Sequence, residues 1–182
     1  MPLRFNQLLV EEGIDPADVR LLRHQTNLGG GRSLIEAWRT DRIAFEDYQA
    51  RQLTAKRSSF MRPYWAAFLG TWDGRTLFAG LYAASEPVLI DEPIEVPLTG
   101  TIAPPGTVDR FTTTLAEPLG DYAGRLYIEW GGGSSGKRSW NQRADVQDKV
   151  ITELHLDQTE RPFPDVMAIA SPLSVIGEAP PG

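Results

Sequence analysis

The feature that most constrains the fold is the stretch YWAAFLGTWDGRTLFAGLYAAS, which spans residues 64–85. It holds two apolar runs joined by the sequence WDGR at positions 72–75. An Asp-Gly pair between two apolar runs is a strong signal for a β-hairpin, because both residues tolerate the positive φ angles of a tight turn. The stretch therefore predicts two long paired strands, at about 65–70 and 76–84.

The rest of the chain predicts few helices around this hairpin. Ser33 and Glu36 have the spacing of a capping box, and the apolar residues after them recur at helical intervals. They predict the main helix over 33–52, with room for a break near Thr40 and Asp41. Apolar runs elsewhere predict five or six strands in all, and no strand-helix-strand rhythm appears. The sequence thus predicts an α+β fold: a small, partly closed β-barrel with one main helix packed against it.

Length and composition predict one domain. A chain of 182 residues with 41% apolar residues suffices for one sizeable core, which we expect within residues 1–170. The ending GEAPPG is typical of a linker, so residues 171–182 are predicted to lead toward a further domain. The chain has no cysteine, no signal-peptide pattern and no apolar run of membrane-spanning length. These features predict a soluble, cytoplasmic protein without disulfides or thiolate metal sites.

The charge is unevenly distributed along the chain. The net charge is −6, which argues against a surface that attracts nucleic acid everywhere, but binding depends on the local potential. Residues 51–62 hold four basic side chains and no acid, whereas residues 86–95 hold four acids and no base. The basic run can follow a phosphate backbone or be an ordinary solvated surface.

The stretch GGGSSGKRSWNQR, at 131–143, is the strongest candidate for a site. Its glycine tract is typical of a mobile loop or of a close approach to a ligand, and basic and amide residues surround Trp140. The tract does not match the phosphate-binding pattern GxxxxGK[ST], because Arg138 follows Lys137. The loop is therefore interpreted either as an element that inserts into a nucleic-acid groove or as a plain hairpin tip.

Patterns for an enzyme, a metal or a cofactor are weak. The two histidines, His24 and His155, do not form a known ligand pattern, and no nucleophile elbow occurs. We therefore predict no catalytic residue, no metal and no cofactor in this chain. If it is a carboxylate nuclease nonetheless, Asp145, Asp148 and Lys149 are the residues to suspect, although the preferred interpretation is a local charge network with Arg143 and Lys149.

Several segments together resemble a known family. The chain resembles the N-terminal region of bacterial proteins that carry a GIY-YIG or HNH nuclease in their C-terminal half. The segments that carry this resemblance are, in order, LLRHQ, AWR, FEDYQ, YWAAFLG, RTLFAGLY, GDYAGRLYIEWG and RSWNQRADVQDKVITEL. The hairpin with its FAGLY strand also resembles the PUA superfamily, which includes the EVE, ASCH and YTH domains. Neither nuclease motif occurs in this sequence, so any endonuclease activity is expected in a domain beyond residue 182.

The resemblance implies a specificity module for DNA, one that recognises a modified base, such as a modified cytosine, in a restriction system. Such a reader turns the base out of the duplex and holds it between aromatic faces and hydrogen-bonding groups. The candidate pocket residues are Trp140, Tyr64, Trp65, Tyr82, Tyr122, Trp130, Arg138, Ser139, Asn141 and Gln142. The candidate contacts to the DNA backbone are Lys137, Arg138, Arg143, Arg51, Lys56, Arg57 and Arg62. The alternative is a barrel that binds a small molecule or a protein and has no affinity for nucleic acid.

Overall fold

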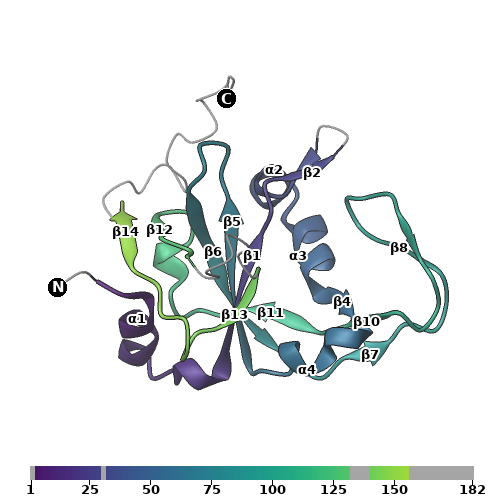
Figure 1. The fold of residues 1–182 in the computed structure, drawn as a ribbon, viewed down its shortest axis with the longest axis horizontal. Coiled ribbons are helices and arrows are strands. Elements are labelled where there is room, and N and C mark those ends of the chain that lie inside the picture. The colour runs from purple at the N-terminus through teal and green to yellow at the C-terminus, as the bar shows by residue number, and fades with distance from the viewer. Residues whose placement is uncertain (1–2, 30–31, 132–139, 156–182) are drawn as a thin grey trace.

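The computed structural model describes residues 3–29, 32–131 and 140–155. The predicted hairpin is confirmed: β5 (Tyr64–Gly70) and β6 (Thr76–Ala84) pair antiparallel in the middle of a seven-stranded mixed sheet. Both strands are buried along most of their length, because helices cover both faces of the sheet (Figure 1).

The other strands of the main sheet are β1 (Val19–His24), β11 (Thr113–Leu115), β12 (Leu126–Ile128), β13 (Asn141–Arg143) and β14 (Ile151–Leu154). Their order is β13-β1-β5-β6-β12-β14, and β11 pairs with the carboxyl-terminal end of β6. β1 runs parallel to β5, and all the other pairs in this sheet are antiparallel. The sheet is curled, with β13 and β14 as its two outer strands.

The helices are α1 (Phe5–Glu11), α2 (Leu34–Thr40), α3 (Arg42–Ala50) and α4 (Arg57–Phe60). Single 3-10 turns occupy Pro16–Asp18, Thr54–Lys56 and Gly120–Tyr122. The smaller sheets comprise β4 (Arg51–Leu53), β10 (Val108–Arg110) and β7 (Val88–Leu89), then β2 (Asn27–Gly29) with β3 (Arg32–Ser33), and β8 (Ile94–Glu95) with β9 (Ile102–Ala103).

The predicted main helix is present as two helices. Ser33 caps α2, since its hydroxyl accepts a hydrogen bond from the Glu36 amide at 3.2 Å. Asp41 ends α2 and also caps α3, accepting from the Ala44 amide at 3.3 Å. The break near residue 41 is therefore confirmed, and a single aspartate produces it.

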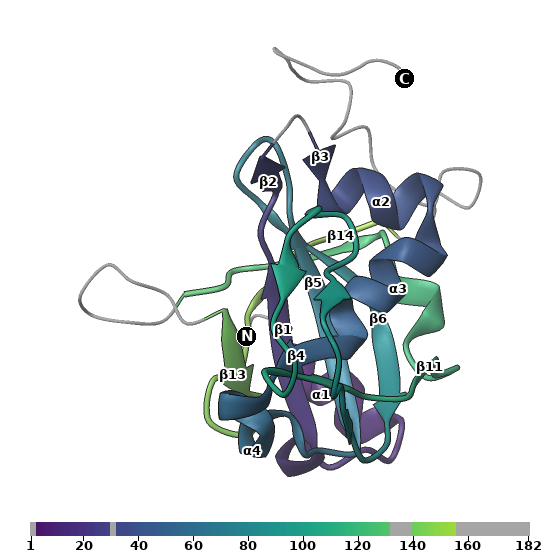
Figure 2. The same cartoon turned by 90° about the vertical axis from the view of Figure 1, so that its right-hand side faces the viewer.

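The core consists of two main layers, one on each face of the sheet. One layer lies under α1 and includes Phe5, Phe68 and Phe78, whose rings pack within about 5 Å of one another. The other layer lies under α2 and α3, and includes Trp38 and Phe45. Figure 2 shows the second face, with α2 and α3 in front of the sheet. The sheet is thus covered on both sides rather than rolled around a single interior.

The predicted partly closed barrel is only partly realised. The α+β class and the curled sheet agree with the expectation, but no ladder joins β13 to β14 within the described residues. The sheet has seven strands rather than five or six, because the polar β13 was not expected. Three further short strands, β7, β8 and β9, lie in residues 87–105 and belong to the smaller sheets. The predicted domain end at residue 170 and the linker 171–182 lie outside the described part of the chain.

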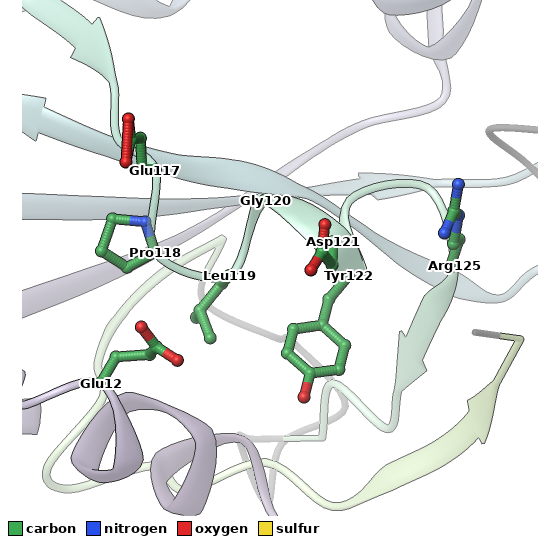
Figure 3. A pocket seen from close by; sticks show the side chains of 8 residues that line it. All are labelled: Glu12, Glu117, Pro118, Leu119, Gly120, Asp121, Tyr122 and Arg125. Carbon is green, nitrogen blue, oxygen red and sulfur yellow. The ribbon is translucent and has the colours of Figure 1, made fainter. Parts of the chain in front are cut away.

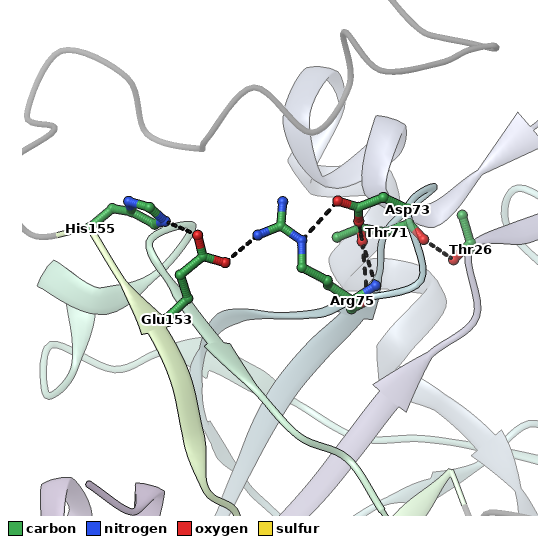
Figure 4. A network of polar contacts seen from close by, with 6 residues as sticks. All are labelled: Thr26, Thr71, Asp73, Arg75, Glu153 and His155. Carbon is green, nitrogen blue, oxygen red and sulfur yellow. Dashed lines mark hydrogen bonds and ion pairs between the residues drawn. The ribbon is translucent and has the colours of Figure 1, made fainter. Parts of the chain in front are cut away.

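A polar network fastens the hairpin turn to the neighbouring strands (Figure 4). The Arg75 side chain donates to Asp73 within the turn at 2.8 Å and also to Glu153 of β14. Glu153 in turn accepts from the His155 ring at 2.9 Å. The Arg75 guanidinium lies 4.0 Å from the centre of the buried Tyr127 ring. These contacts hold β14 against the hairpin although only three pairs of residues join β14 to β12.

A β-bulge in β6 sets which side chains face which layer. Ala67 opposes Gly80 and the next residue, Phe68, opposes Phe78, so Ala79 is the extra residue. The bulge inverts the alternation along β6: Leu81 joins the α1 layer, and Tyr82 joins the α2 layer. Gly80 has φ +141°, a value that residues with a side chain rarely adopt.

We predict that Gly80→Ala destabilises the protein by about 1–3 kcal/mol, because the new Cβ forces a strained φ. It would also lie 3.1 Å from Leu115 Cδ1. Denaturant unfolding measures the change. Gly120→Ala serves as the matched control, because a Cβ there meets no atom within 4 Å. Equal stabilities of the two variants would contradict the importance of this bulge.

Candidate functional site

A cleft of about 400 Å³ lies beside the carboxyl end of β1, between α3, the small sheet of β4 and β10, and the start of β13. Its polar wall is formed by Arg23, His24, Gln25, Tyr48, Arg51 and Gln52. Its apolar wall is formed by Leu34, Leu53, Val96, Val108 and Trp140. A few polar groups among apolar ones, in a volume of this size, are typical of a site for a small ligand.

Among the predicted pocket residues that the structure describes, Trp140 lines this cleft. Its side chain is 40% exposed, although it packs on one ring: the centroids of Trp140 and Phe60 are 5.7 Å apart. The Trp140 carbonyl accepts a hydrogen bond from the Arg23 amide at 2.7 Å, which extends the β1–β13 ladder by one residue. The ring is thus held in place by the fold while much of its surface stays accessible to a ligand.

His24 forms a buried, neutral part of the cleft. Its Nε2 donates to Gln49 Oε1 at 2.6 Å, and its ring meets the edges of Phe45 and Tyr48. Burial lowers the pKa of His24 to about 4, so the imidazole carries no charge at neutral pH. The histidine therefore supports the wall of the cleft through its bond to Gln49 and adds no charge to it.

Two further polar side chains of the cleft come from the end of α3 and from β4. Arg51 donates to the Asp47 carbonyl at 3.0 Å and forms an ion pair with its carboxylate. Gln52 donates to the Gln49 carbonyl at 2.8 Å. The Arg51 charge is therefore already balanced by its own helix, and its role here is to shape the wall.

The predicted backbone contacts separate into two groups. Arg57 binds the buried carboxylate of Asp109 with two hydrogen bonds of 2.8 and 2.7 Å, and hydrogen bonding from Arg57 lowers the Asp109 pKa. Arg57, like Arg51, thus supports the fold. Lys56 is exposed, and Arg62 and Arg143 lie near β13. The basic run 51–62 does not form one continuous track.

Three predicted pocket aromatics belong to the core. Trp65, Tyr82 and Trp130 are 0%, 1% and 4% exposed. The indole of Trp65 donates to the Phe60 carbonyl at 3.0 Å, and the Tyr82 hydroxyl donates to Glu46 at 2.8 Å. None of the three can stack on a ligand in this conformation. The sequence set Trp140 apart by the charged and amide residues around it, but it left open whether Trp65 and Trp130 belong to the core, because the central strands are apolar on both faces and show no alternation.

The buried Lys149 supports Trp130 from the other side. Its ammonium donates to the Trp130 carbonyl and to Gln142 Oε1, and it lies 4.2 Å from the centre of the Trp130 ring. Burial lowers the pKa of Lys149 to about 8. Lys149 and Gln142 therefore form a structural polar contact inside the α1 layer, on the face of the sheet away from the cleft.

Tyr64 and Tyr122 lie away from Trp140. Both are half-buried and pack against the α1 layer. Tyr122 lines a second hollow, of about 710 Å³, together with Glu12, Glu117 and Asp121 (Figure 3). Although this hollow is larger than the cleft, its carboxylates outnumber its one cation, Arg125, and they repel a phosphate backbone. We therefore take the cleft beside Trp140 as the candidate site.

The remaining predicted site residues divide between the described and undescribed parts of the chain. Lys137, Arg138 and Ser139, with the preceding glycine tract, lie outside the described residues. Asn141 is buried, and its Oδ1 accepts from Arg20 Nε at 2.7 Å. Sequence reasoning missed Arg20, Arg23 and the cleft residues of α3. The polar character of β1 at Arg20, Arg23 and His24 was the available signal.

Comparisons with known proteins do not identify the chain. It matches no family model, no curated protein and no solved structure. Within residues 3–29, 32–131 and 140–155, no helix is long and apolar enough to cross a membrane. The same described residues contain no group of three histidine or acidic side chains arranged to hold a metal ion.

The low pKa of His24 makes stability depend on pH. Because the folded pKa is near 4 and the unfolded value near 6.5, the unfolded chain binds the proton first. Stability is therefore lost as the pH falls from 6.5 to 4, by about 3 kcal/mol in full.

When the pH falls from about 7 to about 4.5, we predict that the free energy of unfolding drops by about 2–3 kcal/mol more in the wild type than in His24→Gln. Denaturant unfolding at both pH values measures the difference. The two proteins share every carboxylate, so the difference isolates the imidazole. Identical pH dependence in the two proteins would show that His24 is not held neutral by burial.

Proposed function

We propose that the chain is a cytoplasmic DNA-binding specificity module that holds a modified base, turned out of the duplex, in the cleft beside Trp140. The observation that carries the proposal is an accessible tryptophan, fixed by the ladder with β1, at a cleft with neutral hydrogen-bonding groups. A flipped base needs an aromatic face for stacking and polar atoms for its edge. Trp140 provides the first, and the less buried Tyr48 and Gln25 provide the second.

The proposal includes a relationship to nuclease-associated domains and to PUA-like readers, which the sequence resembles. The curled sheet around a buried hairpin is compatible with a PUA-like reader. Since the sequence contains neither a GIY-YIG pair nor an HNH cluster, we assign cleavage to a separate nuclease domain of a restriction system. The module itself then needs no catalytic residue and no cofactor.

A small planar molecule is the second candidate occupant of the same cleft. The volume of about 400 Å³ lies within the usual range for ligand sites, and the net charge of −6 does not favour DNA at long range. The two candidates differ in their response to salt. DNA binding releases counterions and therefore weakens steeply as salt rises, whereas a neutral ligand is nearly insensitive.

The proposed function predicts salt-dependent binding to labelled duplexes, with a preference for one modification. Fluorescence anisotropy with unmodified, methylated, hydroxymethylated and phosphorothioate duplexes, between about 50 and 200 mM salt, measures both properties. Equal and negligible binding to all four duplexes would exclude the DNA reader and leave the small-molecule site.

Trp140→Ala is predicted to lower affinity for the preferred duplex by roughly 5- to 150-fold, since stacking of a base on an aromatic ring contributes about 1–3 kcal/mol. Affinity for plain duplex should change far less. Trp72→Ala is the matched control, because Trp72 is also exposed, at 47%, but does not line the cleft. Melting of both variants verifies folding. A folded Trp140→Ala protein that keeps its preference would refute the proposed pocket.

A further inference from the structure

Three arginines from distant parts of the chain lie close enough to repel one another at the amino-terminal end of β1. Arg20 of β1 and Arg143 of β13 are direct cross-strand partners. Val19 pairs with Tyr64, so Arg62, two residues before Tyr64, lies at the same end of the sheet. Arg62 and Arg143 both lower the pKa of Arg20, after the larger effect of burial, as expected for neighbouring positive charges.

The contacts of these arginines leave an excess of positive charge. Arg143 forms two hydrogen bonds with Asp145, of 3.1 and 2.8 Å. Arg20 donates from both Nε and Nη2 to the neutral amide oxygen of Asn141. Arg62 Nε is buried, and among the described residues it has no hydrogen-bond partner. Asp145 is the acid whose charge raises the pKa of Arg20, so three guanidinium groups share one nearby carboxylate.

This arrangement is unfavourable without a further anion. Like charges on directly opposed residues of two strands destabilise a sheet, and partial burial of Arg20 strengthens the repulsion. The buried Asn141 nevertheless fixes the Arg20 side chain in place. A fold that holds one guanidinium in place near two others is suited to bind an anion with several acceptor oxygens.

We propose that Arg20, Arg62 and Arg143 bind a phosphate group, and that in the complex this is the backbone phosphodiester next to the base held at Trp140. The second part rests on the proposed function. Asn141, which orients Arg20, follows Trp140 directly, and Phe60, on which Trp140 packs, precedes Arg62 by two residues. The phosphate site is therefore continuous with the tryptophan. The guanidinium fork matches phosphate oxygens better than a single ammonium does.

The first experiment uses inorganic phosphate and does not depend on DNA. Melting of the wild-type protein is followed with rising phosphate against chloride at matched ionic strength. An anion that binds the folded protein at free concentration c stabilises it by RT ln(1 + c/Kd), so the melting temperature rises with the phosphate concentration. We expect the rise in the wild type and its loss in Arg20→Gln and Arg62→Gln. Arg39→Gln is the control, because Arg39 is exposed on α2 and pairs with Glu36. No rise in the wild type, or the same rise in all variants, would overturn the phosphate site.

The second experiment measures how duplex binding depends on salt. The slope of log K against log salt depends on the number of phosphates that the protein neutralises, at about 0.9 for each. Replacing Arg20, Arg62 and Arg143 together by Gln should therefore lower the slope by about that amount, and Arg20→Gln or Arg62→Gln alone should lower it by less. Arg20→Lys keeps the charge and should keep the slope even if affinity falls. It also provides a folded variant if Arg20→Gln does not fold.

The two experiments separate the two proposals. Protection by phosphate without any duplex binding would support the arginine site and refute the DNA reader. Duplex binding with unchanged slopes in the variants would refute the arginine site as the backbone contact while leaving DNA binding intact. If the same variants lose stabilisation by phosphate and show a lower slope of log K against log salt, the result supports both the arginine site and its contact with the DNA backbone.

Discussion

The pairing of β5 with β6 is the interaction on which the rest of the structure depends. These two strands are buried on both faces and supply residues to both core layers. The bulge at Ala79 and Gly80 decides which residues of β6 enter which layer. Because a strand alternates with a period of two, a straight β6 would exchange Leu81 and Tyr82 between the layers. The hairpin therefore presents different side chains to its two faces, so α1 could not pack on the face that α2 and α3 cover.

The candidate site follows from how β1 pairs with this centre. β1 lies parallel to β5, and its residues Val19 and Leu21 face the α1 layer. Alternation directs Arg20 and His24 to the opposite face, where α3 and α4 lie. β13 then adds Asn141 and its neighbours along the free edge of β1. One short strand thus places the neutral histidine at one end and the arginine at the other, with Trp140 between them.

The sequence predicted those elements that depend on local chemistry. The Asp-Gly turn indicated the hairpin, Ser33 indicated the start of a helix, and a break in that helix was expected near Asp41, because caps and turns act over a few residues. β13 was missed because its residues, Asn141 to Arg143, have polar side chains, and it becomes a strand only through pairing with β1.

The same distinction explains which site residues could be foreseen. Trp140 was recognisable because charged and amide residues surround it, whereas Trp65 is an equally large aromatic in a strand without alternation. The meeting of Arg20, Arg62 and Arg143 could not be predicted, since their positions in the chain are separated by many residues and only the sheet register unites them.

The register also shows why charge counted along the chain is a poor guide to this protein. In the basic run 51–62, Arg51 and Arg57 are bound to Asp47 and Asp109, so half of its cations support the fold. The positive excess arises where Arg62, at the end of this run, lies near Arg20 of β1 and Arg143 of β13. The hollow beside Tyr122 belongs to the opposite face, that of the α1 layer, and is acidic. Although the chain as a whole is acidic, Arg20, Arg62 and Arg143 make one face locally positive, and the carboxylates of the hollow beside Tyr122 make the other face locally negative.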